Sequence, residues 1–586
     1  MVRGRSTRRQ VSKTAIAPAR ASHDVPTRHL TVLAQDPTVR GPGGKALTTR
    51  VRLPAERLEP GPMGHRVHVI DYDATTDTYY RPRERDLSSD PYEKITDVAR
   101  LVGDPQFHQQ NVYAIVMATM GEFEAALGRP LDWGFNSPAH QLKVAPHAFA
   151  EANAYYSRDS ESLCFGYFAG TSGRTVFTCL SHDVVAHETS HALLDGLRSF
   201  YLFPSHVDQA AFHEGFSDIV ALLSVLKSSE VLEHALGPVT DSRNLVRSAD
   251  LSRSKLAAGF PFRLAEQFGR ELDQPLAEGL RHSIRLEPSP QLLKQEQYHE
   301  PHRRGEIVVA AVLGSFLSFW EKRLDALGRD RNLALNRTVI CEEGATAAKQ
   351  LLRILIRALD YMPPVDMRFG DYLSAVLTAD QQLVPDDGRF HYRDSIRAAF
   401  AAFGILPASG RRPDGAWEPP PADRPVSYDG LHFELLRQDP HAAFRFIWEN
   451  RDALGADPDA FTRVTAMRPC TRVSSDGFVL RESLVEYVQT LQVQAYELKR
   501  LGIRKPVGLS GQETIHLYGG GTLIFDEFGH LKFHIGTGVR SRLQTDRLEN
   551  LLDRGDMSRG ARRLSSFAQM HRRRLSVGLR QAREQW

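Results

Sequence analysis

The chain has 586 residues, of which 41% are hydrophobic, and this length predicts about two to four domains because one hydrophobic core stops growing well before it. The formal net charge of +3 is small for this size and does not indicate a nucleic acid or an anionic surface as partner. No run approaches the roughly 18 apolar residues of a membrane span, and the basic N-terminus lacks the apolar stretch of a signal peptide. We expect no nucleic-acid partner, no membrane span and a cytoplasmic location, with export by a non-classical route left open.

The four cysteines are widely spaced and form no C-x-x-C pair: Cys164, Cys179, Cys341 and Cys470. Such spacing in a long chain suits reduced thiols better than a disulfide framework. We therefore expect them to pack as small hydrophobic residues.

The N-terminal part of the chain predicts strands followed by a helix. Residues 1–28 are basic and poor in large apolar side chains, which predicts a disordered arm. Short alternating runs separated by Gly and Pro over 29–80 predict strands. Apolar side chains at helical spacing over 106–128, ending on Gly128, predict a long helix with one apolar face.

The middle of the chain predicts two lobes of different composition. Residues 130–180 are typical of short strands, and 182–404 are typical of helices interrupted by a polar loop near 284–305. We therefore expect a β-rich region over 29–181, followed by a helical lobe over 182–405.

The C-terminal part predicts a further module behind a linker. The density of Pro, Gly and Arg over 406–427 cannot continue a core and predicts a linker. Residues 428–545 predict an α+β module with a helix over 483–501 and a hairpin in GGGTLIFDEFGHLKFHIG. Residues 546–586 predict a basic tail. The fold class expected for the whole chain is α+β.

The stretch HDVVAHETSHALLDG contains the pattern H-E-x-x-H at positions 187–191. Two histidines four residues apart lie one turn apart on the same helix face, so His187 and His191 can reach one metal ion. Glu188 between them would point beside that ion, toward a bound water. Apolar flanks and Gly196 agree with a buried helix that ends there.

A second segment, AFHEGFSDIV at 211–220, supplies further candidates. Glu214 lies 23 residues after His191, and a helix, loop and returning helix could bring its carboxylate to the same ion. Asp218, one turn further on, could accept an N–H from a ligand histidine and fix its tautomer. Two histidines and one glutamate leave a fourth zinc position open for water, which is typical of a catalytic site.

These two motifs together resemble those of the thermolysin-like zinc metalloproteases, also called gluzincins. Three further segments resemble parts of the same family: Asn153-Ala154-Tyr155-Tyr156 its substrate-binding edge strand, Tyr298 to Gly305 its histidine-bearing segment, and DYLSAVLTADQQL with SIRAAFAAFGI its closing helices. The resemblance covers about 105–405 with the order of elements kept. It implies a two-lobe metalloprotease core, with a β-containing N-lobe and a helical C-lobe. The C-terminal α+β module is an addition to this core.

The resemblance implies a role for each matching residue. His187, His191 and Glu214 would bind zinc, Glu188 would act as general base, and Asp218 would orient a ligand histidine. His302 would stabilise the oxyanion, while Asn153 and Ala154 would hold the substrate as an added β-strand.

The chain departs from the family pattern at several positions. Residue 213 is His rather than Asn, and an aromatic insert at 199–204 makes Tyr201 only a candidate for the substrate-binding tyrosine. His299 competes with His302, and the acidic partner of that histidine could be Glu296 or Glu300. Arg247 could be a substrate-side arginine or a solvated one.

Calcium is not expected at the double site of the family. Asp183 matches a calcium-ligand position, but residue 225 is Val where the family has Glu, and no acid-rich loop follows.

The sequence thus predicts a zinc-dependent metalloendopeptidase that acts on a peptide or protein substrate. The alternative is a non-catalytic zinc-binding scaffold whose C-terminal module binds a protein partner. Proteolysis that is lost on chelation would exclude the alternative.

Overall fold

The computed structural model describes residues 26–553, except 83–86, 88, 136–140, 171–172, 203–204, 238–243, 253–254, 257–281, 284, 330–332, 409–411, 430 and 475–476. Most of the predicted arm and most of the predicted tail lie outside the described residues. The described chain mixes helices and strands, in agreement with the α+β class. None of its helices combines the length and the apolar character that crossing a membrane requires.

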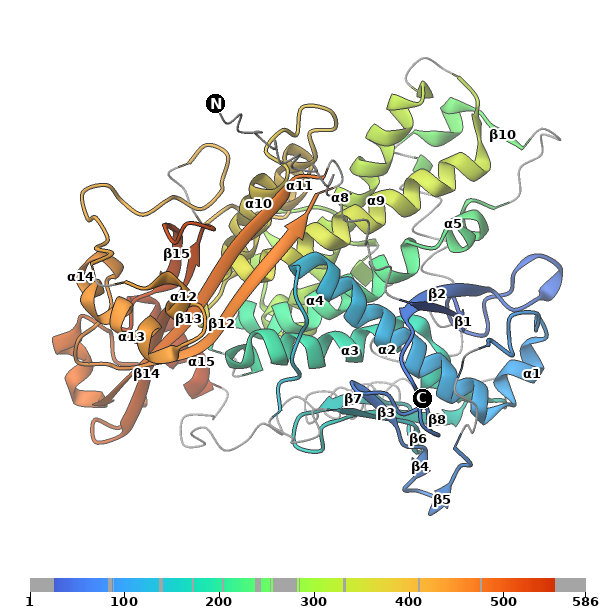
Figure 1. The fold of residues 1–586 in the computed structure, drawn as a ribbon, viewed down its shortest axis with the longest axis horizontal. Helices are drawn as coiled ribbons and strands as arrows, with labels where there is room; N and C mark the ends of the chain where they lie inside the picture. The colour runs from blue at the N-terminus through green and yellow to red at the C-terminus, as the bar shows by residue number, and fades with distance from the viewer. Residues whose placement is uncertain are drawn as a thin grey trace, which may run out of the picture.

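Strands dominate the N-terminal part, as the alternating sequence predicted (Figure 1). β1 (Thr27–Leu33) pairs antiparallel with β2 (Thr48–Pro54), and β4 (Tyr72–Asp73) pairs with β5 (Thr78–Tyr79). A five-stranded sheet has the order β3-β6-β8-β7, with β9 paired to β8. Its strands are β3 (Val67–Val69), β6 (Leu142–Phe149), β7 (Ala154–Ser157), β8 (Ser162–Ala169) and β9 (Thr175–Phe177). Strand β7 therefore lies at the end of the sheet.

The predicted helix at 106–128 is α2 (Pro105–Leu127), and its environment differs from the expected one. Asp104 caps it by accepting a hydrogen bond from the Gln106 N–H at 3.0 Å, and Gly128 ends it with a left-handed φ of 71°. The expectation of a single apolar face is wrong, because every residue over 107–117 is buried. The helix packs against β1, β2, β6, α3 and α9, so its polar side chains must find partners inside the protein.

Helices dominate the part after the sheet. They are α3 (His182–Leu197), α4 (Val207–Leu226), α5 (Ser229–Leu236), α8 (Pro301–Ala326), α9 (Arg337–Arg357), α10 (Phe369–Leu383) and α11 (Tyr392–Ala402), with α1 (Val98–Val102) preceding α2. Two short strands, β10 (Leu245–Val246) and β11 (Leu335–Asn336), pair beside them. The single-turn helices are η1 (Pro42–Gly44), η2 (Thr178–Leu180), η3 (Ser199–Leu202), η4 (Ser248–Leu251), η5 (Leu292–Lys294), η6 (Glu296–His299) and η8 (Ala358–Tyr361).

Two glycines let α4 and α8 come into backbone contact. A Cβ atom on Gly215 would lie 2.9 Å from the carbonyl oxygen of Gly305, and one on Gly305 would lie 2.9 Å from that of Ala211. Larger residues would push the helices apart. Because Glu214 adjoins one glycine and His302 lies one turn before the other, this contact brings the two side chains together.

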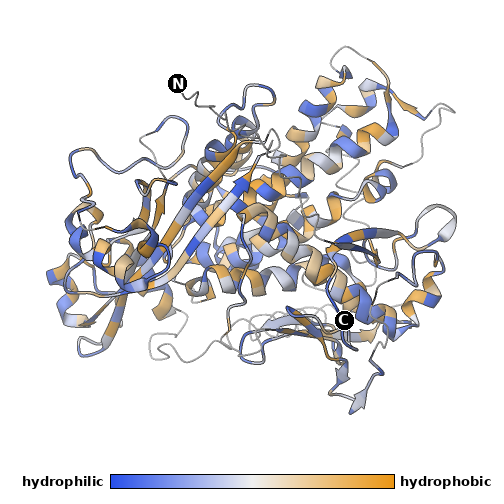
Figure 2. Ribbon diagram, viewed as in Figure 1, coloured by the Kyte–Doolittle hydropathy of each residue, from blue (hydrophilic) through white to orange (hydrophobic). Residues whose placement is uncertain are grey.

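The C-terminal part forms an antiparallel sheet in the order β12-β13-β14-β15. The strands are β12 (Phe461–Val473), β13 (Val479–Gln494), β14 (Thr514–Phe525) and β15 (Leu531–Thr537); α12 (Phe433–Leu436), α13 (Pro440–Glu449) and α14 (Arg451–Leu454) precede them, η9 (Ala495–Leu501) follows β13, and α15 (Leu543–Asp553) comes last. The predicted hairpin is β14 with β15. Figure 2 shows hydrophobic and hydrophilic residues along the long strands β12 and β13.

The predicted helix over 483–501 is wrong, because most of that range is strand β13 and only its end is the short helix η9. Leu484 packs into the main core, whereas Val485 and Tyr487 pack into a second cluster on the other face of the sheet. A strand buried on both faces has a nearly continuous apolar run, which periodicity alone does not distinguish from a helix.

The described residues of 406–427 form no regular helix or strand, but the middle of this stretch is packed against the protein. Ile405 and Ala416 are buried, and the Trp417 indole N–H donates to the carbonyl oxygen of Tyr361 at 2.8 Å. Side chains of the β12–β15 sheet, among them Leu484 and Ile524, belong to the main hydrophobic core. The C-terminal sheet therefore shares a core with the preceding helices.

Candidate metal centre

The H-E-x-x-H segment lies in the middle of α3, which is buried along almost its whole length. His187 and His191 project from one face, with ring centroids 4.5 Å apart at an interplanar angle of 86°. Their Nε2 atoms lie 2.9 Å apart. The one-turn spacing on a helix produces this convergence, as the sequence pattern predicted.

Glu214 of α4 contributes the third atom. Its Oε2 lies 3.6 Å from Nε2 of His187 and 3.7 Å from Nε2 of His191. Tetrahedral bonds of about 2.0–2.1 Å would separate ligand atoms by about 3.3–3.4 Å. The three distances, 2.9, 3.6 and 3.7 Å, scatter around this value, so the residues fit a zinc ion.

The electrostatics of the centre also favour a cation. Burial alone would lower the pKa of His187, but hydrogen bonds with Asp218 and Glu214 raise it to about 10. Carboxylates around a fully buried imidazole thus stabilise positive charge at this place. A bound cation would supply that charge and leave the imidazole neutral.

The outer nitrogens of the two histidines are oriented by α4. His187 Nδ1 lies 2.9 Å from Oδ1 of Asp218, the partner that the sequence suggested. His191 Nδ1 lies 2.8 Å from Nδ1 of His213 and 3.1 Å from Oγ of Ser217. Because the Ser217 hydroxyl donates to the carbonyl oxygen of His213 at 3.0 Å, its oxygen can accept from His191.

His213 and Ser217 were not predicted as part of the centre. His213 attracted notice only as a departure from the family pattern. Helical spacing could have predicted both residues, because positions 213, 214, 217 and 218 lie on one face of α4.

Replacing Asp218 by Ala is expected to weaken zinc binding by about 10–100-fold, because His187 would lose the carboxylate that fixes its tautomer and ring orientation. The dissociation constant can be measured by competition with a chromophoric chelator. Asp250→Ala is a suitable control, since Asp250 pairs with Arg247 and Lys255. Equal zinc affinity of Asp218→Ala and the wild type would contradict the orienting role.

Glu188 lies beside the ligands and faces strand β7. Its Oε2 accepts a hydrogen bond from the Tyr156 N–H at 2.9 Å. Burial raises the pKa of Glu188 to about 7, with the Glu214 carboxylate adding to the rise and His187 opposing it. A carboxylate with a pKa in this range can both accept and return a proton near neutral pH.

His302 comes to the same place from the first turn of α8. Its Nε2 lies 3.6 Å from Oε2 of Glu214, and its Nδ1 donates to Oε1 of Glu300 at 2.6 Å. The sequence left His299 or His302 as the histidine and Glu296 or Glu300 as its acidic partner. The structure brings together His302 and Glu300. Glu300 also caps α8 by accepting from the Arg303 N–H at 2.8 Å.

The Glu300 carboxylate is held in its charged form. Burial alone would raise its pKa, but the hydrogen bond and charge of His302 and the backbone N–H groups of α8 lower it to about 2. The side chain that fixes His302 therefore stays ionised throughout the neutral range.

Asn153 and Ala154 lie at the start of the edge strand β7. The side-chain oxygen of Asn153 accepts from the Ala154 N–H at 2.9 Å, and its backbone carbonyl accepts from the Gly166 N–H at 2.8 Å. Asn153 is 6% exposed, and its Nδ2 has no hydrogen-bond partner within the described part of the chain. A buried amide N–H without a partner is costly unless a ligand accepts its hydrogen bond.

The structure does not bring the remaining candidates to the centre. Tyr201 is fully buried against Phe212, and its hydroxyl donates to the carbonyl oxygen of Pro363 at 2.6 Å, so the structure gives no support to its expected role in substrate binding. The side chain of Arg247 is 82% exposed and pairs with Asp250 at 3.0 Å, as a solvated arginine does. Asp183 accepts a hydrogen bond from the Ser181 hydroxyl at 2.6 Å.

No protein-family model matches the chain, and no curated protein matches it.

Proposed function

We propose that the chain is a zinc-dependent metalloendopeptidase of the thermolysin-like type. The observation that carries the proposal is the convergence of the ligand atoms of His187, His191 and Glu214 beside the carboxylate of Glu188. Three protein ligands leave one zinc position for water or substrate, which is the arrangement of catalytic rather than structural zinc.

The residues around the ion would divide the chemistry of peptide hydrolysis. Bound zinc would lower the pKa of its water and polarise the scissile carbonyl. Glu188, with its pKa near neutrality, would accept the proton of the attacking water and deliver it to the leaving amine. In its imidazolium form His302, fixed through Nδ1 by Glu300, would offer Nε2 as a hydrogen-bond donor to the oxygen that becomes negative.

A peptide substrate fits the edge strand beside the centre. Within the described part of the chain β7 pairs only with β8, so its other edge could take an added strand. The Tyr156 N–H already points to Glu188 from this edge, and the Asn153 amide could donate to a substrate carbonyl. The substrate class that follows is an extended polypeptide.

The order of elements also supports a thermolysin-like two-lobe core. A sheet with β7 at its end precedes α3, the ligand helices α3 and α4 pack together, and α8 follows with His302 at its first turn. In this proposal the sheet-containing part is the N-lobe, and the helices from α3 to α11 are the C-lobe.

The proposal is tested by cleavage of a diverse peptide library before and after removal of zinc. The wild-type chain should cleave internal peptide bonds, lose the activity on treatment with 1,10-phenanthroline, and regain it when zinc is added back. A zinc-loaded, folded chain that is inert on the library would contradict the proposal. It would favour the alternative of a scaffold that binds a protein partner.

A further inference from the structure

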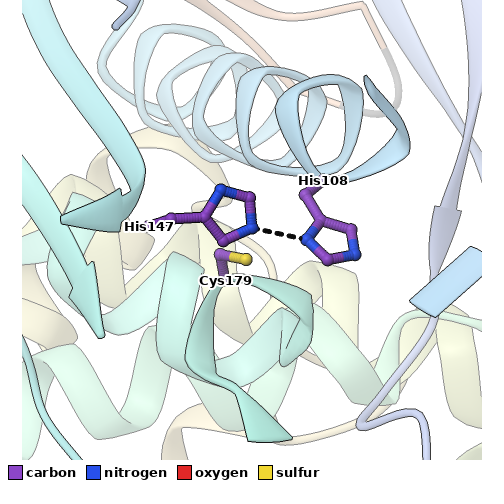
Figure 3. Close-up of side chains that lie close together, drawn as sticks. All are labelled: His108, His147 and Cys179. Atoms are coloured by element: carbon purple, nitrogen blue, oxygen red, sulfur yellow. Dashed lines mark hydrogen bonds between the residues drawn. The ribbon is translucent and has the colours of Figure 1, made fainter. Parts of the chain in front are cut away.

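A second buried cluster of potential metal ligands lies where α2, β6 and the turn η2 before α3 meet. It consists of His108 on α2, His147 on β6 and Cys179 in η2 (Figure 3). One ligand atom from each residue lies within 4.8 Å of the others, and the three residues are at most 1% exposed. The proposed peptidase chemistry uses none of them.

In each imidazole, the nitrogen that points away from the other ring has a hydrogen-bond partner, and this partner determines which nitrogen carries the proton. His147 Nδ1 lies 2.8 Å from Oδ1 of Asp71, whose other oxygen accepts from the side-chain amide of Gln109 at 2.9 Å. His108 Nε2 lies 2.9 Å from the carbonyl oxygen of Val102. A carboxylate and a carbonyl are acceptors, so each outer nitrogen must donate.

The inner nitrogens are then left with lone pairs that face each other. His108 Nδ1 and His147 Nε2 are 2.7 Å apart, and in two neutral rings with these tautomers neither carries a proton. Two lone pairs at this distance repel each other unless one positive centre binds both. That centre can be a proton or a metal ion.

A metal ion explains the third member of the cluster. Figure 3 shows the sulfur of Cys179 lying close to the two facing imidazoles. A shared proton would satisfy the two nitrogens without involving the sulfur, whereas a metal ion could bind all three ligand atoms. We propose that His108, His147 and Cys179 form a second zinc site, separate from the H-E-x-x-H centre.

The charges around the cluster match a divalent ion. Cys179 would bind as a thiolate, and the Asp71 carboxylate, hydrogen-bonded to His147, would supply a second negative charge. Zn²⁺ with these two anions is neutral overall, as a fully buried site requires. Binding would release the thiol proton of Cys179, and any proton shared between the imidazoles, to solvent.

Aromatic rings surround this site, and its three ligands come from three different segments of the chain. The ring centroid of Phe177 lies 4.8 Å from that of His108 and 5.3 Å from that of His147, and the ring centroid of Tyr80 lies 4.6 Å from that of His147. The ion would join α2 and β6 to the segment that leads into α3, eight residues before His187. It would therefore hold the ligand helix against the sheet that carries β7.

Cobalt substitution of the full chain tests the site without any mutation. The H-E-x-x-H centre offers no sulfur ligand, so a thiolate-to-cobalt charge-transfer band in the near ultraviolet can arise only from a site that contains a cysteine. We expect the band in the wild-type chain and in His187→Ala, and its loss in Cys179→Ser. The matched control is Cys341→Ser, another buried thiol, which should keep the band.

Metal content gives the second measurement. The wild type should bind about two zinc ions per chain, Cys179→Ser and His187→Ala about one each, and the double variant about none. A wild-type chain with no thiolate band, or zinc content unchanged in Cys179→Ser, would overturn the proposal. Copper in place of zinc, lost with Cys179→Ser, would overturn the assignment of the metal as zinc. If Cys179→Ser does not fold, the cobalt spectrum of the wild type alone shows whether a thiolate binds the metal.

Discussion

Replacing Glu188 by Gln is expected to slow peptide hydrolysis by about 10²–10⁴-fold while leaving the zinc content unchanged. Gln has nearly the same shape and can still accept the Tyr156 N–H, which donates to Glu188 at 2.9 Å in the wild type. It cannot accept a proton from water. The buried carboxylate whose pKa is near 7 is thus removed without removing a metal ligand.

The measurements are kcat/KM on a cleaved peptide and zinc per chain for both proteins. Glu230→Gln serves as the control, because Glu230 lies at the start of α5 and its carboxylate accepts from the Ser228 hydroxyl. It should cleave at the wild-type rate. Wild-type activity of Glu188→Gln would disprove the general-base role, and loss of zinc from it would show that Glu188 also maintains the metal centre.

Replacing Asp360 by Asn is expected to lower the free energy of unfolding by about 3–5 kcal/mol, because it leaves buried guanidinium groups without their counter-ion. Both oxygens of Asp360 accept from Arg129 at 2.6 Å, and Arg472 of β12 also binds this carboxylate. These ion pairs join the end of α2 to the C-terminal sheet. Burial would raise the pKa of Asp360, but the two arginines hold it well below its usual range.

The pH dependence of this effect follows from the depressed pKa. The stabilisation is fully present above the unfolded-state pKa of about 3.9 and is lost as the pH falls toward the lower folded-state value. Denaturant unfolding should therefore show a large difference between wild type and Asp360→Asn at pH 7 and a smaller one below about pH 4.

A matched control comes from an exposed ion pair. Asp546 pairs with Arg368 at 2.6 Å, with its side chain 48% exposed, so Asp546→Asn should change stability by less than about 1 kcal/mol. Equal effects of the two substitutions would contradict the importance of the buried network for docking the C-terminal sheet.

Local sequence determined the parts of the centre that lie within one turn of a helix. His187 and His191 converge because residues four apart share a helix face, and Glu214 and Asp218 lie on one face of α4 for the same reason. The sequence also determined the strands before α3 and the hairpin of β14 with β15, whose alternation reflects the two faces of a sheet.

Only the tertiary structure decided those features of the fold and of the metal centre that depend on contact between elements far apart in the sequence. Glu300 rather than Glu296 became the partner of His302, because Glu300 caps α8 beside it. The close approach of α4 and α8 at Gly215 and Gly305 brought His302 to Glu214. Burial on both faces made β13 a strand where its apolar run predicted a helix. Such choices depend on which surfaces meet, and no local period encodes that.

The cluster of His108, His147 and Cys179 shows this difference most clearly. From the sequence, Cys179 was expected to be an ordinary buried thiol, and neither histidine formed a motif with it. The three residues come from a helix, a strand and a single turn, and they meet only because α2 packs against β6 and η2. The sequence therefore determined the ligand spacing of the first centre, and only packing brought the second cluster together.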